Sequence, residues 1–213
     1  SFLCVGIDIS TDSLGSDNLE DLISHSKKVI DATKDIALAY KPNFAFFERW
    51  GADGFKWLEH IIGYIGDGPI TIADAKRGDI GNTAKQYAAS IFGHFGFDSV
   101  TLNPFMGEDS ILPFLTNEEN GVFILCRTPN PSGKTFQSLK LNDELKIYEK
   151  VAKWADSLND NDNVGLVVGA TVPEELVKVR KLAQNLPILI PGVGAQGGDL
   201  ESCIREGNKS GIG

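Results

Sequence analysis

Seven short apolar segments recur along this 213-residue chain, and stretches long enough for amphipathic helices separate them. These segments are residues 2–8, 39–47, 70–74, 99–102, 122–126, 164–168 and 188–190. Strands that are apolar almost throughout, rather than alternately apolar and polar, are typical of a parallel sheet covered by helices on both faces. The sequence therefore predicts an α/β fold.

The intervening stretches carry apolar residues at helical spacing over 19–37, 87–95 and 145–158, and a short helix is expected over 199–206. Asn82 is a candidate N-cap for the second of these helices, and Gly96 is expected to end it. Thr171 and Glu174 have the spacing of a capping box at the start of a further helix.

Seven such units predict a (β/α)8 TIM barrel that forms one domain over residues 1–213. The alternative is a doubly wound sheet, but no predicted strand is followed by a complete G-x-G-x-x-G motif. The eighth strand and last helix of a barrel are not found, and an open barrel would leave unpaired edges, so either the sequence lacks a C-terminal segment or the strand count is short by one. We expect the natural chain to continue past Gly213.

Composition excludes several classes of partner. A net charge of −9 without a stripe of Lys and Arg argues against nucleic acid. The longest apolar runs fall well short of the roughly 20 residues needed to cross a bilayer. Three widely spaced cysteines suggest reduced core thiols, and the three histidines fall on predicted helices without metal-ligand spacing. We expect a soluble, cytoplasmic protein that holds no metal.

Polar residues gather at or just after the predicted strand ends, where a barrel places its active site. They are Asp8, Lys41, Asn43, Asp74, Lys76, Asn103, Thr128 and Gln196. The densest group lies in residues 72–83 (IADAKRGDIGNT). On a strand, Asp74 and Lys76 would share a face, and Asp79 follows in a loop after Gly78. The alternative is a solvated salt-bridge cluster, which would contribute little to stability.

The D-x-K-x-x-D motif formed by Asp74, Lys76 and Asp79 resembles that of the orotidine 5′-phosphate decarboxylase family. The motif alone is shared with related barrels that act on sugar phosphates. Its extension over residues 80–83 (IGNT), together with residues 41–46 (KPNFAF), narrows the resemblance. The likeness runs from residues 5–8 (VGID) to residues 191–198 (PGVGAQGG). It implies decarboxylation of orotidine 5′-phosphate to uridine 5′-phosphate in pyrimidine biosynthesis, without any cofactor.

The resemblance also implies catalytic roles. Lys76 would donate a proton to C6 of the pyrimidine, and Asp74 would lie against the substrate carboxylate. Lys41 would join them in a charge relay. Asp79 would complete the relay from a second subunit, and Ile80 and Thr83 would cross the interface with it. A homodimer with shared active sites is therefore expected.

The resemblance further implies substrate contacts, which are Asp8, Asn43, Thr128, Pro191, Gly192, Gly194 and Gln196. Asp8 and Asn43 match the contacts to the ribose and the orotate ring, although both residue types are also common turn formers. The glycine-rich segment suits close approach of the backbone to a phosphate. The arginine with which the family grips the phosphate belongs to the eighth strand, so it would lie beyond Gly213.

Three other functions stay open. A magnesium-dependent barrel acting on a sugar phosphate would use the same triad with an added carboxylate ligand. An aldolase would form a Schiff base on Lys76 or Lys41, but flanking carboxylates favour an ammonium over a nucleophilic amine. A non-enzymatic barrel would bind a pyrimidine nucleotide without turnover.

Overall fold

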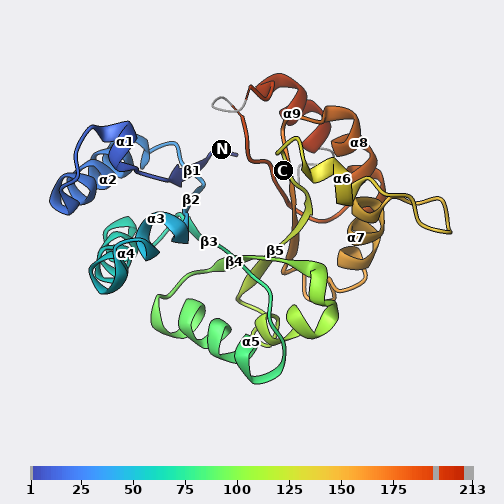
Figure 1. Cartoon of the computed structure of the whole chain (residues 1–213), viewed down its shortest axis with the longest axis horizontal. Coiled ribbons are helices and arrows are strands. Elements are labelled where there is room, and N and C mark those ends of the chain that lie inside the picture. The colour runs from blue at the N-terminus through green and yellow to red at the C-terminus, as the bar shows by residue number, and fades with distance from the viewer. Residues whose placement is uncertain (1, 194–196, 209–213) are drawn as a thin grey trace. The chain divides into compact units, whose positions relative to one another are not determined.

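A computed structural model describes residues 2–193 and 197–208 of the chain (Figure 1). Within them, seven strands follow the order β1-β2-β3-β4-β5-β6-β7, so each strand neighbours the next one along the chain. The strands are β1 (Cys4–Ile7), β2 (Ala39–Pro42), β3 (Ile70–Arg77), β4 (Ser99–Leu102), β5 (Gly121–Arg127), β6 (Val164–Val168) and β7 (Ile188–Leu189). The pairs β1–β2, β2–β3, β5–β6 and β6–β7 are parallel. The prediction of an α/β fold with seven of the eight strands of a barrel is confirmed for the described residues.

Helices connect successive strands. The α-helices are α1 (Thr11–Leu14), α2 (Leu19–Thr33), α3 (Phe44–Glu48), α4 (Gly51–Ile65), α5 (Gly81–Ala88), α6 (Gly133–Gln137), α7 (Ile147–Asp156), α8 (Pro173–Leu182) and α9 (Leu200–Gly207). A π-helix, η1 (Ala89–His94), continues α5, and Gly96 follows it with a φ of 71°. Three short 3-10 helices follow β4, namely η2 (Pro104–Met106), η3 (Glu108–Ser110) and η4 (Leu112–Phe114).

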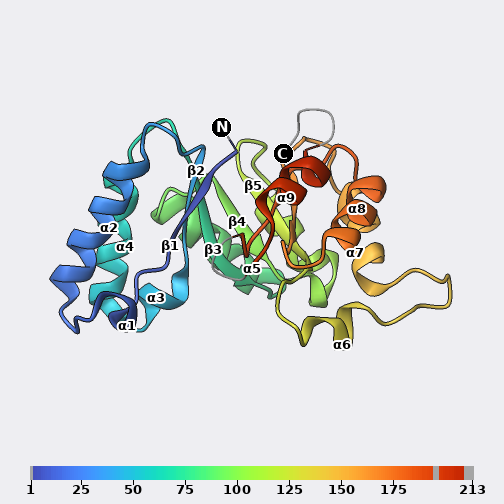
Figure 2. The same ribbon diagram turned by 90° about the horizontal axis from the view of Figure 1, so that it is seen from above.

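The chain divides into two compact units, and the single domain expected from the sequence stays a prediction. The first unit is Ser1–Ala75 with Lys85–Val100. In it, β1 pairs with β2 from Cys4↔Ala39 to Ile7↔Pro42. Helices α2 and α4 lie side by side in both ribbon views (Figures 1 and 2). Burial of aromatic surface stabilises the packing of α3 on α4: Phe47 and Trp57 are almost fully buried, with ring centroids 4.2 Å apart.

The second unit is Lys76–Ala84 with Thr101–Gly213. Strands β5 and β6 pair from Val122↔Val164, and the register shifts between Leu125 and Arg127. Helices α7, α8 and α9 pack in succession (Figure 2). Arg180, which is 2% exposed, joins the end of α8 to α9 because its guanidinium donates to the carbonyl oxygens of Leu186 and Gly207 at 2.7 and 2.9 Å.

Several sequence-based boundaries were wrong. The predicted strand 39–47 ends at Pro42, because Asn43 caps α3, which begins at Phe44. Asn82 does not cap the next helix, because α5 already begins at Gly81. Thr171 forms no capping box, since the N-cap of α8 is Val172 and the Thr171 hydroxyl donates to the Pro129 carbonyl at 2.9 Å. A helix was expected around His60, but the bounds of α4 were not predicted.

Candidate active site

A buried ion pair joins the end of β2 to the middle of β3. The Nζ atom of Lys41 donates to Oδ2 of Asp74 at 2.7 Å, and the two side chains are 13% and 10% exposed. The strands are in register at Ala39↔Ile70, and an isolated bridge pairs Asn43 with Asp74. Two of the four predicted catalytic residues are therefore in direct contact.

Opposing effects set the pKa of Lys41. Burial disfavours its ammonium form, but the carboxylates of Asp74 and Asp8 favour that form, and together they hold the pKa of Lys41 above its ordinary value. Cys4 lies in the same electrostatic environment. Burial raises the pKa of the Cys4 thiol to about 11, and Lys41 opposes this increase. At neutral pH this group therefore contains a lysine cation and an uncharged thiol.

Asp8 and Asn43 directly follow β1 and β2, two neighbouring strands of the first unit. Asp8 follows β1 directly and is exposed. Asn43 follows β2, and its Oδ1 accepts a hydrogen bond from the Ala45 amide at 3.3 Å. The side chain of Asn43 thus has a structural role as the N-cap of α3.

Lys76, near the end of β3, has an unusual backbone conformation. Its φ of 47° lies in the left-handed region, which costs an L-residue about 1–2 kcal/mol. Its backbone N–H donates to the Thr101 hydroxyl at 3.0 Å, and the Arg77 carbonyl accepts from the Asn103 N–H at 2.7 Å. The residue is exposed. Lys76 is therefore in contact with solvent, while its main chain is fixed to β4 by a hydrogen bond.

The loop after β3 presents the remaining motif residues. Asp79 is half-buried, and its Oδ1 accepts from the Ile80 amide at 2.8 Å. Ile80 is 47% exposed, and Thr83, in the first turn of α5, is also exposed. An apolar side chain with nearly half its surface in water is compatible with a contact to another molecule.

Thr128, just after β5, is held by a residue that sequence reasoning missed. Oε1 of Gln137 accepts from the Thr128 amide at 3.0 Å, and its Nε2 donates to the Thr128 hydroxyl at 2.8 Å. Gly133 leaves room for this arrangement, because a Cβ there would lie 2.8 Å from the Thr128 hydroxyl oxygen. A lone Gln at the end of a short polar helix has no pattern that would reveal such a role.

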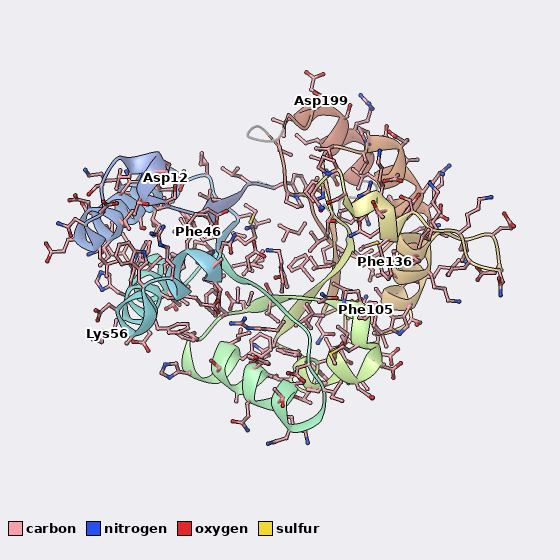
Figure 3. All side chains as sticks on the ribbon, in the orientation of Figure 1. Asp12, Phe46, Lys56, Phe105, Phe136 and Asp199 are labelled. Atoms are coloured by element: carbon pink, nitrogen blue, oxygen red, sulfur yellow. The ribbon has the colours of Figure 1, made fainter. Side chains whose placement is uncertain are left out.

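The same helix α6 makes an aromatic contact. The exposed rings of Phe136 and Phe105 lie against each other, with centroids 5.8 Å apart (Figure 3). This contact ties α6 to η2, which follows β4. The loops after β4 and β5 are therefore linked through α6.

The glycine-rich segment after β7 is described in part. The Ala170 amide donates to the Pro191 carbonyl at 2.9 Å, and the Gly198 amide donates to the Gly192 carbonyl at 3.0 Å. Gly192 has a φ of 96°, a conformation that side chains disfavour. The predicted contacts Gly194 and Gln196 lie outside the described residues.

Among residues 2–193 and 197–208, no group of three or more His, Cys, Asp or Glu side chains has an arrangement that could hold a metal ion. No helix in the described part of the chain is long and apolar enough to span a membrane.

Several curated proteins are similar in sequence to this chain. An orotidine 5′-phosphate decarboxylase of Halorubrum lacusprofundi is 52% identical over 183 residues, which are 85% of this chain and 64% of that protein. One of Natronomonas pharaonis is 47% identical over 217 residues, covering all of this chain and 80% of that protein. The chain thus spans less than two thirds of the first relative and four fifths of the second.

Solved structures share the fold. Leishmania donovani UMP synthase matches with a TM-score of 0.93 and 42% identity, over 99% of this chain and 46% of that one. A Leishmania donovani OMP decarboxylase matches with a TM-score of 0.90 and 39% identity, over 97% and 79%. The family model described as "Orotidine 5'-phosphate decarboxylase / HUMPS family" matches residues 1–209. The chain therefore belongs to this family and has its barrel fold.

Proposed function

We propose that this protein decarboxylates orotidine 5′-phosphate to uridine 5′-phosphate, a step of pyrimidine biosynthesis, in the cytoplasm and without a cofactor. The observation that carries the proposal is the buried ion pair between Lys41 of β2 and Asp74 of β3, because β3 also bears Lys76. A family match over residues 1–209 and relatives named for this activity support it.

Lys76 is the proposed proton donor. When the bond between C6 and the carboxylate breaks, its electron pair stays on C6 and CO₂ leaves. The ammonium of Lys76 stabilises the resulting carbanion and transfers a proton to C6, and solvent then reprotonates the amine. The exposed position of Lys76 near the end of β3 suits a group that must reach a bound substrate.

Asp74 and Lys41 provide fixed charge in this proposal. Asp74 faces the substrate carboxylate, and the like-charge contact is relieved as CO₂ departs. Lys41 remains an ammonium because neighbouring carboxylates raise its pKa, so it balances and orients Asp74. Charges that are already in place need no rearrangement during the reaction.

Substrate binding and assembly complete the proposal. Asp79, Ile80 and Thr83 act in the active site of a second subunit, and the exposure of Ile80 and Thr83 supports a role in such an interface. The remaining proposed substrate contacts are Asp8, Asn43, Thr128, Pro191, Gly192, Gly194 and Gln196. The absorbance change of the pyrimidine on adding orotidine 5′-phosphate, with a chelator present, tests the reaction.

The Lys76→Ala variant is the control in that experiment. We expect turnover in the wild type to be unaffected by the chelator and to be nearly abolished in a folded variant, because both the cation and the proton are lost. A variant that keeps more than a few per cent of the rate would exclude Lys76 as the acid. Loss of wild-type activity on chelation would instead favour a magnesium-dependent reaction on a sugar phosphate, which the shared motif also allows.

A further inference from the structure

Lys76 has a left-handed backbone within a strand. Among the described residues, the other non-glycine residues with positive φ are Glu144 and Asp162, and both lie in connections between elements. A long side chain in this conformation within β3 persists only when its surroundings enforce it. A contact with neighbouring residues must therefore hold the backbone of Lys76 in this conformation.

Thr101 supplies such a contact. Its hydroxyl accepts the hydrogen bond of the Lys76 amide at 3.0 Å, and the side chain belongs to β4, all four residues of which are buried. In a parallel ladder an amide usually donates to a main-chain carbonyl of the neighbouring strand. Here the acceptor is a side chain that is only 1% exposed, so its position is fixed by packing.

We propose that Thr101 is a positioning residue, which fixes the backbone of Lys76 so that its ammonium is aimed at the reacting carbon. This inference rests on the proposed function. Proton transfer depends steeply on the placement of the donor, whereas substrate affinity depends on contacts spread over other loops. Loss of the Thr101 hydroxyl should therefore lower kcat far more than it changes KM.

Variants at two threonines separate positioning from general stability. Thr101→Val keeps the shape of the side chain and removes the acceptor, and Thr101→Ser restores a hydroxyl. Thr71→Val is the matched control: Thr71 lies near the start of β3 and is 5% exposed. Its hydroxyl donates to Asp98 Oδ2 at 2.8 Å and accepts from the Asp98 amide at 3.1 Å, so its loss removes part-buried hydrogen bonds without touching Lys76.

The test combines steady-state kinetics and thermal unfolding of the full chain. We expect Thr101→Val to lower kcat by about 10- to 100-fold with little change in KM, and Thr101→Ser to recover most of this loss. Thr71→Val should lower the melting temperature while kcat stays near the wild-type value. A Thr101→Val enzyme with wild-type kcat, or a kcat loss matched by Thr71→Val, would overturn the inference.

A second readout does not depend on activity. In protein labelled with ¹⁵N-lysine, the Lys76 amide resonance is identified by its loss in Lys76→Ala. We expect it to shift or broaden in Thr101→Val and to stay unchanged in Thr71→Val. An unchanged resonance in Thr101→Val would overturn the inference even if the wild type were inactive, whereas an inactive wild type with a shifted resonance would count against the proposed function alone.

Discussion

Lys41 Nζ and Asp74 Oδ2 are 2.7 Å apart, although 33 positions separate the two residues in the sequence. Both side chains are nearly buried, so each charge has exchanged most of its water for the other. Removing one member of such a pair leaves the other charge buried without its nearest partner, which is more costly than losing the pair as a whole.

We therefore expect Lys41→Met and Asp74→Asn each to lower the free energy of unfolding by about 3 kcal/mol, and the double variant to lose less than the sum. Urea unfolding followed by tryptophan fluorescence measures these changes. The control cycle uses Lys56→Met and Asp53→Asn, a Lys–Asp pair at 3.0 Å whose side chains are 74% and 69% exposed. Equal coupling in the two cycles would contradict the role given to burial.

The proposed shared site predicts complementation between inactive subunits. Mixing Lys76→Ala with Asp79→Ala gives hybrid dimers in which one site has an intact Lys76 from one chain and an intact Asp79 from the other. With random exchange, half the dimers are hybrid, so about a quarter of the wild-type rate should return. The absorbance assay measures this recovery. Silence after subunit exchange has been verified by mass spectrometry would argue that Asp79 acts within its own subunit.

Burial of the Cys4 thiol predicts a loss of stability at alkaline pH. Its pKa is raised from 9.0 to about 11, so the folded state retains the proton more strongly than the unfolded state does. The resulting stabilisation is fully present below pH 9 and is lost as the pH rises through about 11, amounting to about 3 kcal/mol.

The test is to measure the free energy of unfolding of the wild type and of Cys4→Ser between about pH 8 and pH 11. This interval spans the unfolded and folded pKa values of the thiol. The variant should lose stability less steeply with pH, because serine does not titrate there. Comparing slopes removes the constant cost of the substitution itself. Parallel slopes would show that the Cys4 thiol does not contribute.

Two glycines of α4 should respond in opposite ways to alanine. A Cβ at Gly54 would overlap the Phe47 carbonyl oxygen, whereas a Cβ at Gly63 would meet no atom within 4 Å. Gly54→Ala should be strongly destabilising, because backbone cannot move aside cheaply. Gly63→Ala should raise the free energy of unfolding by about 0.5–1 kcal/mol, because alanine has the higher helix propensity. Thermal unfolding of the two variants measures these changes. Similar shifts in melting temperature for both variants would be inconsistent with the packing of α3 against α4.

The sequence pattern located best the strands that are buried throughout. Strands β4 and β6 match their predicted bounds because every residue in them is buried. The pattern failed where polar residues continue a strand: β3 was predicted to end at Asp74 but runs to Arg77. Its last residues are held by hydrogen bonds to Thr101 and Asn103, which are long-range contacts that local composition does not encode.

For the candidate site, strand ends predicted which residues to consider but not how they pair. The contact between Lys41 and Asp74 depends on strand register, and that register follows from packing over the whole unit. At Asn43 the sequence was misleading in the opposite way. The apolar residues that follow it suggested that the strand continues, but the Asn43 side chain caps the helix α3. Thr101 and Gln137 escaped notice because one polar residue among apolar or loop residues has no spacing to interpret.

The strand order β1 to β7 has a consequence for biosynthesis. Each strand neighbours the one made just before it, so a strand that leaves the ribosome meets a partner that has already been synthesised. Among the strands that the structure describes, no neighbouring pair must wait for a distant segment, so each newly made strand can pair soon after its synthesis. The order in which the chain is translated is therefore also an order in which its sheet can grow.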